Sequence, residues 1–159
     1  MPFYRCTITT PLTPDATAER LRGLIGPKPT LRERFAESFG DAPARPPFAG
    51  SLSYGAFTAT RILWYRNSFA PVIRGQYGTS GTGGTRIELF MTLRPLIIAF
   101  ELLWCVLVLS TTMPMIARGE TLSDYLGLGM IAFALFVTIG GFYPEAIYAK
   151  RLIQRAMQA

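Results

Sequence analysis

The sequence predicts an α+β membrane protein, with an N-terminal cytoplasmic antiparallel β-sheet, one or two short helices, a two-helix transmembrane hairpin and an amphipathic C-terminal helix extension. The hairpin is predicted because residues 95–117 and 126–143 are apolar runs that contain one charged side chain, that of Glu101. A helix of about 20 apolar residues crosses the hydrocarbon core of a bilayer. The sheet is predicted because apolar and polar residues alternate between residues 48 and 93.

The N-terminal segment predicts one strand followed by one helix. Residues 3–10 alternate and are rich in β-branched and aromatic side chains, as is typical of a strand. A short amphipathic helix is expected next, because Thr13 is a good N-cap residue and Pro14 suits the first helical position. Gly26 and Pro27 end this helix.

The proline-rich connector over residues 27–50 holds a second candidate helix. Thr30 and Glu33 form a capping box, in which each side chain satisfies a free backbone N–H group. The apolar face that follows contains Leu31, Phe35 and Phe39. We expect this face to pack on the sheet; the alternative is a helix that lies on the membrane surface.

Four further strands are predicted, over residues 48–54, 56–65, 71–77 and 85–93. They are expected to form an antiparallel meander with a helix on one face. The last strand leads directly into Pro95, so its end lies at the membrane and the glycine-rich loop 78–84 lies at the far end. Antiparallel pairing returns the loop 66–70 to the membrane, where Arg66 is expected to meet a lipid phosphate and Phe69 to enter the interface.

These patterns divide the chain into a cytoplasmic α+β domain (1–94), the transmembrane hairpin (95–148) and an amphipathic cytoplasmic tail (149–159). The second span is expected to continue past Pro144 as a helix that packs against the domain or a partner. Basic residues flank the outer ends of the hairpin, whereas Arg118 in the intervening loop is balanced by acids. The positive-inside rule therefore places both termini in the cytoplasm.

Few residues offer catalytic chemistry. Histidine is absent, and Cys6 and Cys105 lie in different predicted regions, so neither a His-based proton shuttle nor a cysteine metal site is expected. The loop 78–84 lacks the Lys-Ser/Thr ending of a phosphate-binding loop, which favours a plain hairpin connection. We therefore expect no enzyme activity, catalytic residue, metal or cofactor. For an enzyme, the carboxyl group of Glu88 or Asp41 would have to lie in a pocket and have a raised pKa.

Residues of two kinds are predicted to make contacts in or at the membrane. Membrane or partner contacts are predicted for Glu101, Trp104, Gly127, Gly129, Gly140 and Gly141. Lipid headgroup contacts are predicted for Arg66, Phe69, Arg94, Lys150 and Arg151. Glycines let helices approach closely, and the Glu101 carboxyl group is expected to reach the interface or pair with an Arg rather than transfer protons. The net charge of +6 is expected to face membrane lipids in preference to nucleic acid.

A motif between residues 48 and 87 resembles one found in small uncharacterised bacterial membrane proteins. Its residues are Phe48-x-Gly50, Phe57, Arg61, Tyr65-Arg66-Asn67-Ser68-Phe69-x-Pro71, Gly75 and Gly84-Thr85-x-Ile87. Proteins with this motif combine a cytoplasmic β domain with a pair of transmembrane helices. The resemblance covers about a third of the chain and implies the same architecture, without an activity or a ligand.

The expected function is that of a non-catalytic accessory subunit of a larger bacterial inner-membrane complex, of the respiratory or photosynthetic type. The hairpin would dock on other subunits, and the cytoplasmic domain would brace the complex. The alternative is a membrane-anchored domain that binds or senses a lipid or a small ligand. In that case Arg61, Arg66 and Arg74 are expected to converge at a pocket.

Overall fold

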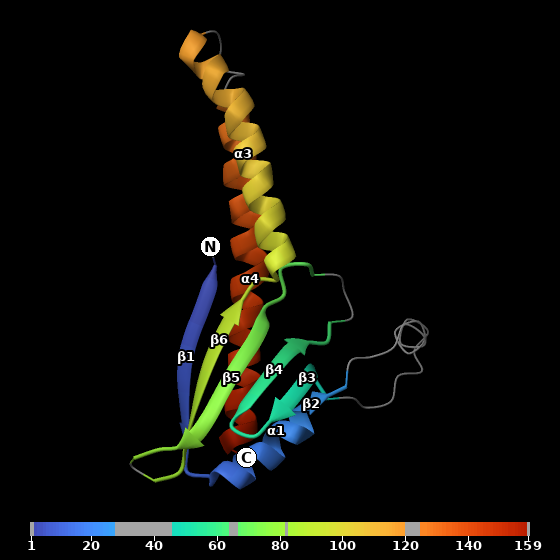
Figure 1. The fold of residues 1–159 in the computed structure, drawn as a ribbon, viewed down its shortest axis with the longest axis vertical. Helices are drawn as coiled ribbons and strands as arrows, with labels where there is room; N and C mark the ends of the chain where they lie inside the picture. The colour runs from blue at the N-terminus through green and yellow to red at the C-terminus, as the bar shows by residue number, and fades with distance from the viewer. Residues whose placement is uncertain (1, 28–45, 64–66, 82, 120–124, 159) are drawn as a thin grey trace.

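The structure is a computed structural model that describes residues 2–27, 46–63, 67–81, 83–119 and 125–158. Its elements are β1 (Phe3–Thr10), α1 (Pro14–Leu24), β2 (Ile25–Gly26), β3 (Phe48–Ser53), β4 (Ala56–Arg61), β5 (Val72–Thr79), β6 (Thr85–Thr92), α3 (Pro95–Arg118) and α4 (Leu126–Gln158). A sheet forms one end of the molecule, and α3 and the first half of α4 extend away from it as a stalk (Figure 1). The candidate helix after residue 29 lies outside the described residues.

The six strands form one sheet in the order β1-β6-β5-β4-β3-β2. Strands β3 to β6 make the predicted antiparallel meander, and β1 pairs antiparallel with β6 along its whole length. Strand β2 was not predicted: its two residues, Ile25 and Gly26, pair parallel with Phe48 and Ala49. Two residues are too few to show alternation, so only the end of the preceding helix was visible in the sequence.

The N-terminal strand and the start of the helix are confirmed, whereas the helix ends at Leu24, before the predicted Gly26 and Pro27. Strand β1 turns alternate side chains toward the core, among them Ile8 and Thr10, which are 6% and 5% exposed. Helix α1 begins after Thr13, whose side-chain oxygen accepts a hydrogen bond of 3.3 Å from the backbone N–H of Ala16. Pro14 is the first helical residue and has no N–H group to satisfy.

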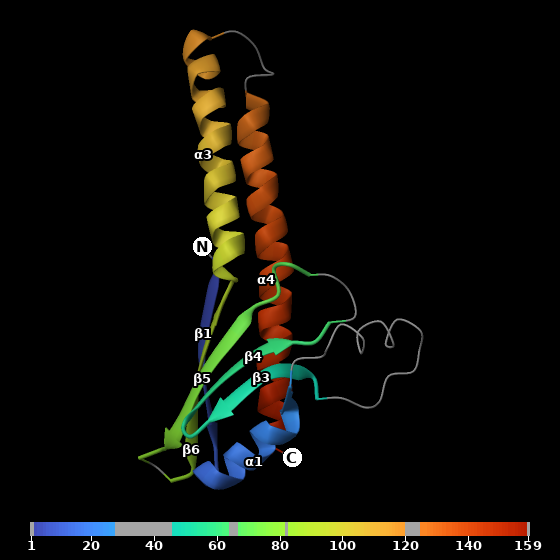
Figure 2. The ribbon, with the colours of Figure 1, turned by 45° about the vertical axis from the view of Figure 1, so that its right-hand side comes forward.

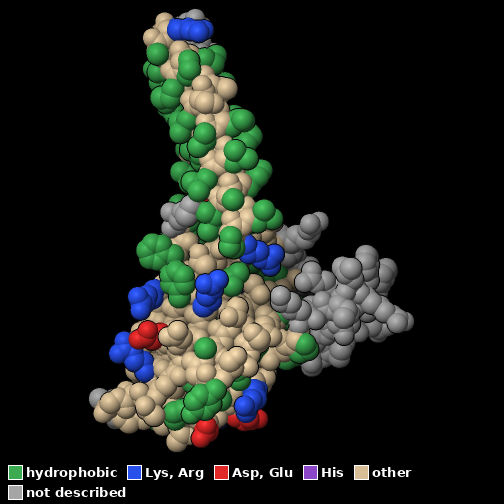
Figure 3. Space-filling model, in the orientation of Figure 1, with side chains coloured by type: hydrophobic (Ala, Val, Ile, Leu, Met, Phe, Trp, Pro, Cys, Tyr) green, Lys and Arg blue, Asp and Glu red, His purple; other side chains and the backbone are tan. Residues whose placement is uncertain are grey.

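Helices α3 and α4 run side by side in opposite directions, as both views show (Figures 1 and 2). Each contains an apolar segment long enough to cross a membrane, and only 11% of that segment is buried inside the structure. Hydrophobic side chains occur along the whole length of the stalk in the space-filling view (Figure 3). We call α3 together with residues 126–143 of α4 the apolar hairpin.

Helix α4 continues past Pro144 without a break and covers the inner face of the sheet with its second half. Pro144 has no N–H to donate to the carbonyl of Gly140, and its ring crowds that carbonyl. One residue farther along, the carbonyl oxygen of Gly141 accepts a hydrogen bond of 3.1 Å from the Asn67 side chain. A side chain of the sheet domain thus adds a hydrogen bond where the proline weakens the helix.

The core of the sheet domain forms between α4, α1 and the inner face of the sheet. The buried stripe of α4 consists of Phe142, Ala146, Ala149, Ile153 and Met157, each at most 3% exposed. These positions recur at helical spacing, and the two alanines let the helix backbone approach the strands closely. Of the two surfaces expected to receive the C-terminal helix, the domain is the one it contacts.

The end of α4 is held by two hydrogen bonds from the N-terminal segment. The Thr10 side chain donates to the carbonyl oxygen of Met157 at 3.1 Å, and the Arg20 side chain donates to that of Ala156 at 3.4 Å. Carbonyls in the last turn of a helix have no partners within the helix, so these donors satisfy groups that would otherwise need water. The first strand and the last helix are therefore fixed to each other.

Two isoleucines on α4 provide a matched test of this packing. Ile153 is 1% exposed and Ile147 is 39% exposed. We expect Ile153→Ala to lower the free energy of unfolding by about 2–5 kcal/mol, because it leaves a cavity in the core. Ile147→Ala should change it by about 0.5 kcal/mol or less. Denaturant titration of the full chain in mild detergent measures both values, and equal losses would contradict the packing of α4 on the sheet.

Candidate functional site

The described residues contain no group of three or more His, Cys, Asp and Glu side chains that could hold a metal ion. Both cysteines are free. Burial raises the pKa of the Cys6 thiol, and this effect exceeds the opposing effect of the Lys150 charge. A raised pKa leaves less thiolate at neutral pH, so Cys6 is poorly suited to nucleophilic chemistry.

Polar contacts gather instead where α4 passes from the apolar hairpin to the sheet domain. We call this region the junction. Its residues are Glu101 on α3, Thr138, Gly141 and Glu145 on α4, Arg61 on β4, and Asn67 and Phe69 in the segment between β4 and β5. Contacts at the junction join segments that are far apart in the sequence.

The first contact of the junction lies inside the apolar hairpin. The Thr138 hydroxyl group, which is buried, donates a hydrogen bond of 2.9 Å to the half-buried Glu101 carboxylate. Glu101 comes six residues after Pro95, and Thr138 comes six residues before Pro144. At about 1.5 Å per residue, both lie roughly 9 Å from the domain end of the hairpin. The predicted contact residue Glu101 is thus placed against α4.

The second contact is an ion pair between β4 and α4. The Arg61 guanidinium donates to the Glu145 carboxylate, and the side chains are 19% and 9% exposed. The same guanidinium lies 4.1 Å from the centroid of the Tyr148 ring, within the range of a cation–π contact. Sequence analysis missed this contact, because Arg61 and Glu145 are 84 residues apart and no local pattern joins them.

We expect Arg61→Met to lower the free energy of unfolding by about 3 kcal/mol, because it removes a cation from beside a buried carboxylate. The double variant Arg61→Met/Glu145→Leu should lose less than the sum of the two single variants. Arg22→Met, which breaks the exposed pair with Glu19, is the control and should have little effect. Thermal or denaturant unfolding of the full chain gives the free energy of unfolding of the natural chain and of each variant. If the loss in the double variant equals the sum of the losses in the two single variants, the pair is not coupled.

The third contact joins the segment after β4 to the glycines of α4. A side chain at Gly141 would press on the Phe69 side chain, with 2.9 Å between the two Cβ positions. A cavity of about 400 Å³ opens beside this contact, lined by Asn67, Phe69 and α4 residues between 137 and 145. Phe69, which was predicted to enter the membrane interface, is half-buried against α4.

The four glycines predicted to contact a partner do not share one face. Gly127 lies against Thr112 of α3, and Gly141 lies against Phe69, so both serve contacts within the chain. Gly129 and Gly140 have no heavy atom within 4 Å of the position of an added Cβ, so both face open space. Trp104, the remaining residue of the set, is half-buried on α3.

The predicted headgroup residues take different positions. Arg94 and Arg151 are exposed, whereas Lys150 is half-buried with its ammonium group 6.0 Å from the centroid of the Tyr4 ring. Arg66 lies outside the described residues.

The expectation that Arg61 and Arg74 meet at a pocket is wrong. Arg61 faces α4, whereas Arg74 is exposed on the opposite face of the sheet. Successive residues of a strand point to opposite faces, and the register of β4 with β5 places the two arginines on different faces.

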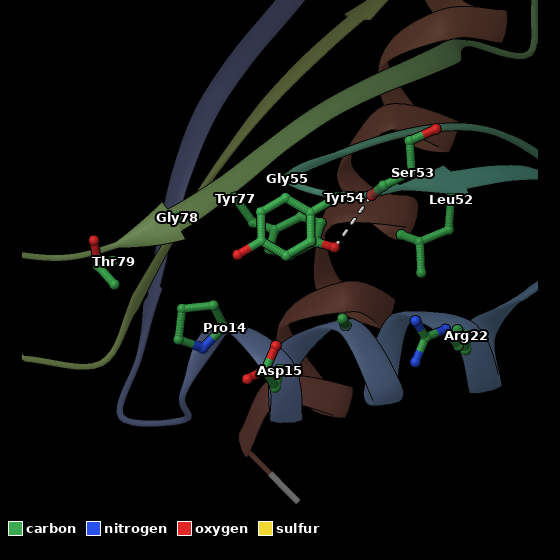
Figure 4. A pocket seen from close by; sticks show the side chains of 11 residues that line it. Pro14, Asp15, Arg22, Leu52, Ser53, Tyr54, Gly55, Tyr77, Gly78 and Thr79 are labelled. Atoms are coloured by element: carbon green, nitrogen blue, oxygen red, sulfur yellow. Dashed lines mark hydrogen bonds between the residues drawn. The ribbon is translucent and has the colours of Figure 1, made fainter.

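A second cavity, also of about 400 Å³, lies at the far end of the sheet domain between α1 and the turn that joins β3 to β4 (Figure 4). Its polar groups include Asp15 and Arg22, which are both exposed. The Tyr77 hydroxyl group donates a hydrogen bond of 3.2 Å to the carbonyl oxygen of Ser53. Exposed charges and an internally bonded hydroxyl group do not select a ligand, so the junction is the stronger candidate site.

Comparisons of the chain with protein-family models, with curated proteins and with solved structures found no match. The resemblance carried by the motif between residues 48 and 87 therefore stays a prediction. What the chain does must be argued from the junction and the surfaces around it.

Proposed function

We propose that the chain is an integral protein of a bacterial inner membrane that serves as a non-catalytic accessory subunit of a larger complex, of the respiratory or photosynthetic type. The apolar hairpin crosses the bilayer and docks on other subunits. The sheet domain lies in the cytoplasm, as do both termini, and braces the cytoplasmic face of the complex. The length and apolar surface of α3 and α4 support the insertion.

The orientation is supported by the charges at the domain end of the hairpin. Arg94 is the N-cap residue of α3, and Lys150 and Arg151 follow the apolar part of α4. Cytoplasmic segments close to membrane spans carry an excess of basic residues. The sheet domain therefore belongs on the cytoplasmic side.

The observation that carries the proposal is the position of Glu101. Within the described part of the chain, its carboxylate has one hydrogen bond, from Thr138. Ionisable groups at membrane depth are costly, and they face the interior of a helix bundle and pair with polar groups there. Two helices alone do not enclose an interior, so a further chain with a hydrogen-bond donor is the partner that Glu101 requires.

Gly129 and Gly140 supply a surface on which that chain can approach. Both face open space on α4, and Gly140 lies close to the level of Thr138. Small residues allow the backbones of two transmembrane helices to come close together. Because α4 is continuous from the hairpin into the core of the sheet domain, a partner bound at these glycines would also fix the position of the domain.

We expect Glu101→Leu to lower the recovery of the partner subunits about tenfold when the tagged full chain is purified from its native membranes in mild detergent. The reason is the loss of a polar interhelical contact, which contributes about 1–2 kcal/mol. Ser110→Ala is the control, since the Ser110 hydroxyl group donates to the carbonyl of Leu107 on its own helix. Unchanged recovery with Glu101→Leu, or no stoichiometric partner with the natural chain, would refute the proposal.

A pair of glycine substitutions separates docking from folding. Gly140→Leu should lower partner recovery by about tenfold and leave the melting temperature of the isolated chain nearly unchanged, because an added Cβ at this position has no heavy atom within 4 Å. Gly141→Leu should lower the melting temperature, because it presses on Phe69. Recovery and melting curves of both variants test this. Full recovery with Gly140→Leu would remove that residue from the docking surface.

A further inference from the structure

The face of the sheet turned away from α4 is not covered by any described element, and basic and aromatic side chains gather on it near the hairpin. In register across three strands, Arg5 on β1 lies opposite Phe90 on β6, which lies opposite Arg74 on β5. One step nearer the hairpin, Phe3 occupies the same face. Phe3 and Phe90 are 61% and 42% exposed. In the space-filling view, blue and green side chains meet below the stalk (Figure 3).

We propose that this surface, which we call the basic–aromatic patch and define as Phe3, Arg5, Arg74, Phe90 and Arg94, binds the anionic phospholipid headgroups of the leaflet next to the sheet domain. The inference rests on the proposed membrane insertion of the hairpin but requires no partner subunit. It assigns a lipid-binding role to Phe3, Arg5 and Phe90, for which no local sequence pattern predicted one. It also gives Arg74 a place on an open surface in place of the expected pocket with Arg61.

The distance from the membrane supports this occupant. Phe90 comes five residues before Pro95, so at about 3.3 Å per residue its backbone lies at most roughly 16 Å from the start of α3. Phe3 pairs with Thr92 and lies closer still. The attraction of an anionic surface falls off over about 8–10 Å, and long arginine side chains can extend toward it. Arg86, nine residues before Pro95, lies up to about 30 Å away.

The charge of the patch also fits a phosphate group. Arg5, Arg74 and Arg94 are exposed, and the acid nearest to them on this face, Glu88, is shared between Arg5 at 3.6 Å and Arg86 at 3.1 Å. A guanidinium group binds phosphate oxygens in a bidentate manner. Aromatic rings beside these cations are typical of protein surfaces at the level of the headgroups.

The test uses the full chain in non-ionic detergent, titrated with phosphatidylglycerol, with the association constant read from native mass spectra. The variant Arg5→Gln/Arg74→Gln should lower that constant by about 30-fold, the factor that two basic residues near an anionic surface contribute together. Phosphatidylcholine should bind the natural chain and the variant equally. Added salt should weaken phosphatidylglycerol binding to the natural chain and have much less effect on the variant.

Two further variants act as controls. Arg86→Gln removes a cation from the same face at the distal end and should lower the association constant much less than the double variant, although Glu88 is then left to Arg5 alone. Arg5→Lys/Arg74→Lys keeps the charge and should restore most of the binding, whereas a purely structural role for the arginines would not be rescued in this way. If Arg5→Gln/Arg74→Gln lowers the melting temperature, Arg74→Gln alone carries the test with about half the effect on a logarithmic scale.

The proposal is overturned if Arg5→Gln/Arg74→Gln binds phosphatidylglycerol as tightly as the natural chain, or if Arg86→Gln loses as much binding. Loss of partner recovery from native membranes with unchanged lipid binding would also overturn it, because an acidic protein surface would then cover the patch. Carbonate extraction of the natural chain checks the underlying insertion separately. A chain that carbonate removes from membranes refutes the anchor itself, whereas a retained chain with unaltered lipid binding refutes only the patch.

Discussion

The packing of one helix, α4, against the inner face of the sheet is the constraint on which the rest of the structure depends. Its first half is apolar all round and its second half has one buried stripe, so a single helix suits two surroundings. The sheet has no other element of comparable length on that face among the described residues. Without α4, the buried side chains of β5 and β6 would face water.

The junction keeps the two halves of α4 in register with the sheet. Arg61 and Asn67 reach α4 from the end of β4 and from the segment that follows it, and each contacts a residue within three positions of Pro144. The hydrogen bond from Thr138 to Glu101 links α4 to α3 only a few residues away. A proline is the point at which a long helix bends most easily, and here side chains from other elements hold it on both sides.

Much of the fold could be predicted because its signals are local. The limits of β1, the cap of α1 at Thr13 and the four strands of the meander each follow from alternation or from turn residues within a few positions. The junction could not be predicted, because Arg61 and Glu145 meet only after the sheet and α4 have packed. The division of the glycines into internal and outward-facing ones likewise depends on the rotation of α4, which the sequence does not specify.

The hydrogen bond between Thr10 and Met157 spans 147 residues, and this span imposes an order on biosynthesis. The strands leave the ribosome first, but their apolar face has no cover until the second half of α4 has been made, after both apolar segments. If the hairpin crosses a bilayer, its apolar segments are therefore made before the core of the sheet domain is complete. During that interval the nascent sheet presents an open apolar surface, and such surfaces are prone to aggregate until they are covered.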